Sequence, residues 1–136
     1  MEKTDVTLKS CVCGKPQGFA QCCGRFLCGQ CHARTPEQLM RSRFTAYALG
    51  GYGEYLLATW LPSAALGLSA EELSKKTLDW QRLDVIFSSQ CGDNGVVEFK
   101  AWFYKEDDYA EMAFMHETST FIRMQSRWFY VGAQGA

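Results

Sequence analysis

Apolar residues recur every three to four positions between residues 36 and 49, which is the spacing of an amphipathic helix. Thr35 stands before this segment as a typical N-cap residue, and Pro36 suits the first helical position. Gln38 completes a capping box with Thr35. The pattern stops at the glycine pair 50–51, so we expect the helix to end there.

Two shorter helices are predicted after this one. The first covers roughly residues 52–60 and ends before Pro62. The second covers about residues 70–77 and begins at a capping box formed by residues 69–72.

The pattern changes after residue 80, where β-branched and aromatic residues become frequent and short turn signals separate them. Helices followed by a meander of strands predict an α+β fold, with the helices on one face of a curved antiparallel sheet. Strands are expected at residues 83–89, 96–104, 111–124 and 127–131, with turns at residues 92–95, 106–108 and 125–126.

One arginine falls on the apolar side of the first helix. At about 100° per residue, Arg43 lies inside the apolar arc. A guanidinium there must reach water or meet an acid, and we expect it to pair with Glu117 first and Asp84 second. Strand alternation places Glu117 and Ser119 on one face of the third strand and His116 on the other. Arg43, Glu117 and Ser119 therefore form the candidate pocket or structural network.

Composition narrows the class of protein. The chain has 136 residues, of which 47% are apolar, and its formal net charge is −1. That balance predicts no nucleic-acid partner and no basic membrane-binding patch. The N-terminal segment lacks the apolar stretch of a secretory signal, so we expect a cytoplasmic protein. Cytoplasmic thiols stay reduced, which favours a metal over disulfides for clustered cysteines.

Six of the seven cysteines lie between residues 11 and 31. Cys11-x-Cys13 is followed eight residues later by Cys22-Cys23, and four thiolates are a closed ligand set for tetrahedral zinc. Iron is the alternative, because a tetrahedron of sulfur atoms suits both metals. The segment is short and would gain much of its folding free energy from the metal.

A second cysteine motif, Cys28-x-x-Cys31-His32, follows directly. By itself it matches the attachment motif of covalently bound haem. That interpretation requires an exported chain, so we predict no haem. Cys28, Cys31 and His32 remain alternate ligands that would replace a member of the first set or hold a second metal.

Several segments resemble the YchJ family of bacterial proteins over nearly the whole chain. They are "CVCG…QCCG", "TPEQLMRSRFTAYALG", "YLLATWLPS", Asp79-Trp80 and "HETSTFIRMQSRWFYVGA". The resemblance implies a metal knuckle of the SEC-C type at residues 1–34, a motif also found in the SecA translocation ATPase. It further implies a nuclear-transport-factor-2-like, or cystatin-like, cone at residues 35–136. In SEC-C motifs the ligands come from the C-x-C pair and the later C-C or C-H pair, which correspond here to Cys11, Cys13, Cys22 and Cys23.

Two functions follow as hypotheses. The first is a non-enzymatic interaction module, whose zinc-stabilised knuckle docks a protein partner; the resemblance suggests ribosome- or secretion-associated proteins. The second is a small-molecule-binding protein or an enzyme that uses the mouth of the cone. No residue is predicted to be catalytic. We expect bulky side chains to leave a mouth smaller than the roughly 300 Å³ of a drug-sized site.

Overall fold

The computed structural model describes residues 10–105 and 108–134, and its helices precede its strands as predicted. The described residues leave out positions 1–9, 106–107 and 135–136. Most of the turn predicted at residues 106–108 therefore lies outside them. The elements in chain order are η1 (Phe19–Gln21), α2 (Gly24–Leu27), α3 (Pro36–Leu49), α4 (Gly53–Ala58), η2 (Pro62–Ala64), α5 (Ala70–Leu73), β1 (Asp79–Cys91), β2 (Asn94–Lys105), β3 (Asp108–Met124) and β4 (Arg127–Ala133).

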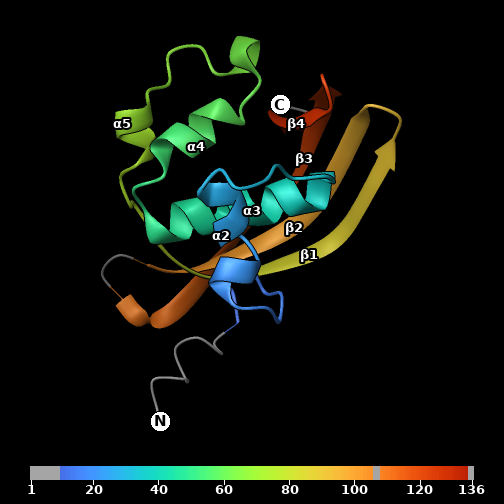
Figure 1. Cartoon of the computed structure of the whole chain (residues 1–136). Helices are drawn as coiled ribbons and strands as arrows, with labels where there is room; N and C mark the ends of the chain where they lie inside the picture. Colours follow the sequence, from blue (N-terminus) through green and yellow to red (C-terminus); the bar gives the residue numbers. More distant parts are fainter. Residues whose placement is uncertain (1–9, 106–107, 135–136) are drawn as a thin grey trace.

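The four strands form one antiparallel sheet in the order β1-β2-β3-β4, which is the meander that the turn signals predicted. The β1–β2 hairpin closes at Cys91 and Asn94, and the β3–β4 hairpin closes at Met124 and Arg127. Register shifts interrupt all three strand pairs, for example between Val85 and Phe87. Such irregularities increase twist and bend strands, so they account for the curvature of the sheet in Figure 1.

Helix α3 begins as the sequence predicted. Thr35 Oγ1 accepts a hydrogen bond from the Gln38 backbone N–H at 3.1 Å. The Gln38 side chain accepts from the backbone of Arg34, one residue before the expected partner of a capping box. Figure 1 shows α3 lying across the sheet, with α4 and α5 beyond it. Within the part of the chain that the structure describes, no helix has the length and apolar character needed to cross a membrane.

Helix α5 is shorter than predicted and ends at Leu73. Ser74 explains this early end, because its hydroxyl and its carbonyl bind the first residue of α4 and the segment before it. Its side chain accepts from the Gly53 backbone, and its carbonyl accepts from the Gly51 backbone, each at 2.8 Å. These tertiary hydrogen bonds turn the chain away from the helical path and hold α5 against α4.

The core lies between α3 and the inner face of the sheet. Leu39 and Phe44 of α3 are buried against Val97 and Phe99 of β2. The N-terminal segment belongs to the same core, since Phe26 is buried in this cluster. The cysteine-rich segment is therefore anchored directly on α3, beside which it lies in Figure 1.

Candidate functional site

The sulfur atoms of four cysteines meet in one buried cluster. The Sγ atoms all lie within 4.8 Å of one another, and Cys13 Sγ is 3.6 Å from Cys22 Sγ. Each of these residues is less than a tenth exposed. We call this group the four-cysteine cluster; its members are Cys11, Cys13, Cys22 and Cys23.

Local backbone geometry brings the two cysteine pairs together. The first pair sits in a tight turn, in which the Gly14 N–H donates to the Cys11 carbonyl at 3.1 Å. Gly14 has φ +103°, a backbone conformation that residues with a Cβ rarely adopt. The second pair stands immediately before α2, and the carbonyl of Cys23 accepts the first bonds of that helix.

Thr45 of α3 lies directly against the sulfur atoms. Its hydroxyl donates to Cys23 Sγ at 3.3 Å and contacts Cys11 Sγ at 3.8 Å, and the residue is fully buried. A hydroxyl donor next to a thiolate stabilises negative charge on sulfur. No local sequence signal predicts this role, because a buried threonine in a helix is ordinary.

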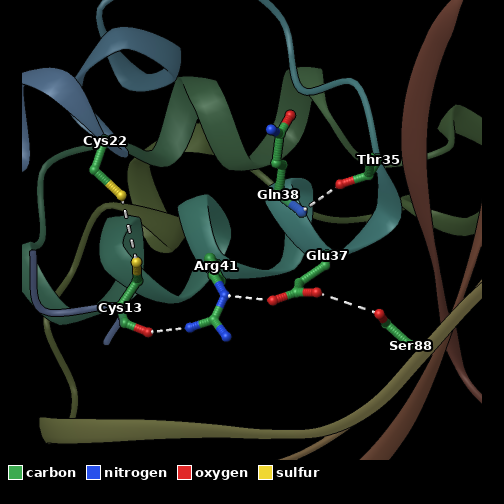
Figure 2. A network of polar contacts seen from close by, with 7 residues as sticks. All are labelled: Cys13, Cys22, Thr35, Glu37, Gln38, Arg41 and Ser88. Atoms are coloured by element: carbon green, nitrogen blue, oxygen red, sulfur yellow. Dashed lines mark hydrogen bonds and ion pairs between the residues drawn. The ribbon is translucent and has the colours of Figure 1, made fainter. Parts of the chain in front are cut away.

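Two arginines hold carbonyl groups of the cluster. Arg41 Nη1 donates to the Cys13 carbonyl at 2.6 Å, while Arg41 Nε binds Glu37 at 2.9 Å (Figure 2). Arg25 Nε donates to the Cys22 carbonyl at 3.1 Å. Both cations would favour an anionic metal–thiolate centre.

The four thiols cannot all ionise on their own. Hydrogen bonds from Cys13 and Cys23 lower the pKa of the Cys11 thiol. Burial, and then the negative charges of Cys13 and Cys11, raise the pKa of Cys22 to about 12. Hydrogen bonds shared with Cys11 and burial raise the pKa of Cys23 as well. A cation is therefore needed to stabilise four thiolates at this spacing.

The geometry of the cluster fits a tetrahedral thiolate-bound metal. Four sulfurs that each lie about 2.3 Å from one ion stand about 3.8 Å from one another. The observed Cys13–Cys22 separation of 3.6 Å is near that value, and all the other separations are at most 4.8 Å. Zinc or iron would thus be held with little movement of the chain.

The second cysteine motif does not join the cluster. Cys28, Cys31 and His32 are all exposed, and both thiols approach the carbonyl of Arg25, at 3.7 and 3.9 Å. Within the described residues, the four-cysteine cluster is the one group of three or more ligand side chains close enough to share an ion. The structure therefore does not bring the alternate ligands together as a metal site.

The comparison with known families agrees with this architecture. The family described as "YchJ, middle NTF2-like domain" matches residues 35–133, which span α3 to the end of β4. The chain belongs to the YchJ family. A UPF0225 protein of Sodalis glossinidius is 38% identical over 125 residues, covering 89% of this chain and 80% of the relative. A UPF0225 protein of Bordetella pertussis is 35% identical and covers 96% of both chains.

Solved structures extend the YchJ likeness to the cysteine-rich segment. The solution structure of a SEC-C motif containing protein from Rhodopseudomonas palustris has a TM-score of 0.82 and 32% identity, covering 93% of this chain and 98% of that one. The crystal structure of a SEC-C motif containing protein from Psychrobacter arcticus has a TM-score of 0.78 and 26% identity, with coverage of 93% and 82%. The predicted α+β fold with a cysteine-rich knuckle is thereby confirmed.

A second candidate site lies inside the YchJ-type cone. A cavity of about 260 Å³ opens between α3 and the inner face of the sheet. It is smaller than about 300 Å³, as expected, yet the aromatic side chains line it rather than fill it. Its wall includes Phe44, Trp60, Trp80 and Phe99 together with the polar residues Arg43, Tyr47, Glu117, Ser119 and Tyr130.

The predicted polar network forms only in part. Ser119 Oγ donates to Glu117 Oε2 at 2.6 Å, and Tyr130 adds a second hydrogen bond to the same oxygen at 2.9 Å. His116 points to the opposite face, where it meets Glu98 at 2.8 Å. The alternation of strand β3 was therefore predicted correctly, and His116 and Glu117 do not form an acid–base pair.

The expected pairing of Arg43 with a carboxylate was wrong. Among the described residues, no carboxylate lies within ion-pair distance of Arg43, although it is only 3% exposed. Its Nη1 donates instead to the Leu56 carbonyl at 2.7 Å and to Thr59 Oγ1 at 2.8 Å. Asp84 is occupied elsewhere by Trp102, at 2.7 Å. The neutral acceptors are closer because the end of α4 runs alongside the helix.

Proposed function

We propose that this YchJ protein binds one metal ion through the four-cysteine cluster and uses the metal-stabilised N-terminal segment as a non-enzymatic docking surface for a protein partner in the cytoplasm. The observation that carries the proposal is the meeting of four buried Sγ atoms within 4.8 Å of one another. The likeness to proteins described as containing a SEC-C motif supports the same site.

Zinc is the metal we propose first, and iron is the alternative. Both accept four thiolates in a tetrahedron. A closed set of four sulfur ligands is typical of a structural zinc site, whereas a catalytic zinc keeps one position open for water or substrate. The burial of all four cysteines favours a structural role, in which the metal fixes the shape of residues 10–34.

Elemental analysis of the purified full-length chain tests the metal site. We expect one zinc per chain in the unchanged protein and a clear loss of bound metal in Cys22→Ser. Cys91→Ser is the matched control, because Cys91 is exposed at the end of β1 and should not affect metal content. Full metal content in Cys22→Ser would contradict the proposed ligand set.

The surface beside the cluster suggests the chemistry of a partner. A groove of about 290 Å³ lies over Cys22 and is lined by Lys15, Arg25 and Arg41, together with glutamine side chains and Phe26. Its lining contains no carboxylate. Positive charge in a concave surface attracts a negatively charged segment. We therefore propose an acidic segment of a protein as the occupant; the SEC-C likeness suggests ribosome- or secretion-associated proteins.

A charge-reversal experiment tests docking separately from folding. Lys15→Glu changes an exposed residue of the groove, and Lys75→Glu makes the same change beyond α5 as the control. We expect a partner identified by cross-linking and mass spectrometry to be lost with Lys15→Glu and kept with Lys75→Glu. Binding of this partner to the unchanged protein should weaken as salt is added. Equal recovery with both variants, or binding that is unaffected by salt, would count against this groove as the docking surface.

A second candidate function uses the interior of the cone. The cavity of about 260 Å³ and its polar wall residues favour the binding of a small molecule at a second site, whose lining includes none of the four cysteines. This candidate does not depend on the metal, and a protein can carry both sites.

A further inference from the structure

The cavity wall contains opposite charges that do not touch. Arg43 and Glu117 both line the cavity, but no distance between their charged atoms is short enough for an ion pair. The charge of Glu117 nevertheless acts on Arg43, because it opposes the lowering of the Arg43 pKa that burial causes. The two groups therefore face one space from different places on its wall.

The guanidinium of Arg43 has more N–H donors than its protein hydrogen bonds use. Its hydrogen bonds to the Leu56 carbonyl and to Thr59 both start from Nη1, and Tyr47 of the cavity wall shares a further side-chain hydrogen bond with the guanidinium. The rings of Trp60 and Tyr130 lie 4.7 and 4.6 Å from its central carbon, which holds the planar group in place. A guanidinium has five N–H donors, which is more than these three hydrogen bonds use, so an acceptor in the cavity could take a further one.

One carboxylate oxygen of Glu117 can likewise accept a further hydrogen bond. Ser119 and Tyr130 both donate to Oε2, and none of the hydrogen bonds between described residues ends on Oε1. Trp60, another wall residue, has an indole N–H that is buried without a partner among the described residues. A buried donor without a partner, such as this indole N–H, is unusual in a folded interior.

We propose that the cavity binds a small uncharged molecule with an apolar ring or chain and a planar amide-type group. The carbonyl oxygen of the ligand would accept from Arg43, and its N–H would donate to Glu117. The rest of the wall is mainly aromatic and aliphatic, so it suits the apolar part. This inference rests on the second candidate function and is independent of the metal site.

Charge balance decides the class of ligand. Arg43 and Glu117 together give the wall no net charge. In these apolar surroundings an anionic ligand is repelled by the carboxylate, and a cationic ligand is repelled by the guanidinium. Size sets the limit: about 260 Å³ corresponds to about nine water molecules at roughly 30 Å³ each. One ring with a single polar group is accommodated, whereas a drug-sized ligand is not.

Three benzene-ring probes of similar size and different charge test the class. Benzamide, benzoate and benzylammonium are titrated into the full-length, metal-loaded protein, and the indole signals of Trp60 and Trp80 are followed by NMR. We expect benzamide to bind at least about tenfold more tightly than either charged probe, because each charged probe leaves one unfavourable charge contact. Preference for a charged probe would overturn the ligand class alone.

Two variants then test whether Glu117 causes the preference for the uncharged probe. In Glu117→Gln the wall has a net positive charge, so benzoate should overtake benzamide. Glu98→Gln removes a carboxylate from the opposite face of the sheet and should leave the order of the probes unchanged. If Glu117→Gln fails to fold, the order measured with the unchanged protein still decides. Absence of any shift with all three probes would overturn both this inference and the second candidate function, without affecting the metal site.

Discussion

Thr45 Oγ1 donates a hydrogen bond to Cys23 Sγ at 3.3 Å, and this contact joins the middle of α3 to the N-terminal segment. The same hydroxyl lies 3.8 Å from Cys11 Sγ, so one side chain reaches both cysteine pairs of the cluster. The two residues are fully buried and 22 positions apart in sequence. The main helix of the cone is therefore part of the surroundings of the proposed metal, and the two regions should stabilise each other.

Thr45→Val should weaken metal binding. Valine keeps the volume of the side chain but removes the hydroxyl that stabilises charge on sulfur, and loss of such a contact typically lowers metal affinity about 10- to 100-fold. Thr45→Ser is the matched control, since it keeps the hydroxyl and should remain close to the unchanged protein. Competition with a colour-forming chelator measures the affinity. Equal affinity in the valine and serine variants would show that the hydroxyl does not contribute.

Cysteine alkylation should divide the seven thiols into two sets. In the metal-loaded protein, a small maleimide should label the exposed residues Cys28, Cys31 and Cys91 and leave the four-cysteine cluster unmodified. Metal ligation and burial both protect the cluster. After treatment with a chelator and denaturant, all seven should react, as read by mass spectrometry. Protection of Cys28 and Cys31 in the metal-loaded protein would instead indicate that they take part in metal binding.

Glu37→Gln should lower stability at neutral pH and lose that effect in acid. Burial alone would raise the Glu37 pKa, but the hydrogen bond and charge of Arg41 outweigh burial, and the pKa is lowered. The charged form is thus favoured by folding, so its contribution is complete above the unfolded-state pKa of about 4.3 and disappears as pH falls through the lower folded-state value. We expect a difference of about 0.5–1 kcal/mol at pH 7.

Urea unfolding of both proteins at matched pH checks this expectation, because any loss of metal in acid then affects both alike. Ser88→Ala is the companion variant. It removes the hydroxyl that donates to the other Glu37 oxygen at 3.3 Å and leaves the ion pair with Arg41 intact (Figure 2). A difference for Glu37→Gln that stays constant from pH 7 to acid would exclude the ion pair as its cause.

Features set by neighbouring residues could be predicted from the sequence. The Thr35 cap, the glycine stop after α3 and the alternation that buries Ser119 each depend on a few consecutive positions. The meeting of the two cysteine pairs could be predicted for the same reason, because a tight turn and a helix start are enough to bring them together.

Contacts made across the fold could not be predicted in this way. Thr45 reaches the cysteines only because the N-terminal segment packs on α3. Arg43 finds Thr59 because the residues after α4 bridge to β4, where Trp60 pairs with Tyr130. Such a bridge has no local signal, and a nearby hydroxyl or carbonyl can replace a carboxylate as the partner of a buried cation.

The surroundings of Arg43 lead to a final prediction, which compares the stability lost in Glu117→Gln with that lost in Arg43→Lys. If Arg43 and Glu117 formed a buried ion pair, removing the carboxylate would leave an uncompensated charge and cost about 3–5 kcal/mol. Here Glu117 binds two hydroxyl groups and acts on Arg43 only at a distance. Glu117→Gln keeps an acceptor in place, so it should cost only about 1–2 kcal/mol, the scale of weakened hydrogen bonds to a charged group.

Arg43→Lys should be the costlier change, at about 2–4 kcal/mol. Lysine keeps the charge, but its compact ammonium group lacks the planar fork that contacts Leu56 and Thr59 while lying against the rings of Trp60 and Tyr130. The loss therefore comes from geometry and ring contact, and it should persist at high salt. Urea unfolding of the two variants measures the order. A larger loss for Glu117→Gln than for Arg43→Lys would restore the ion pair as the main partner of Arg43.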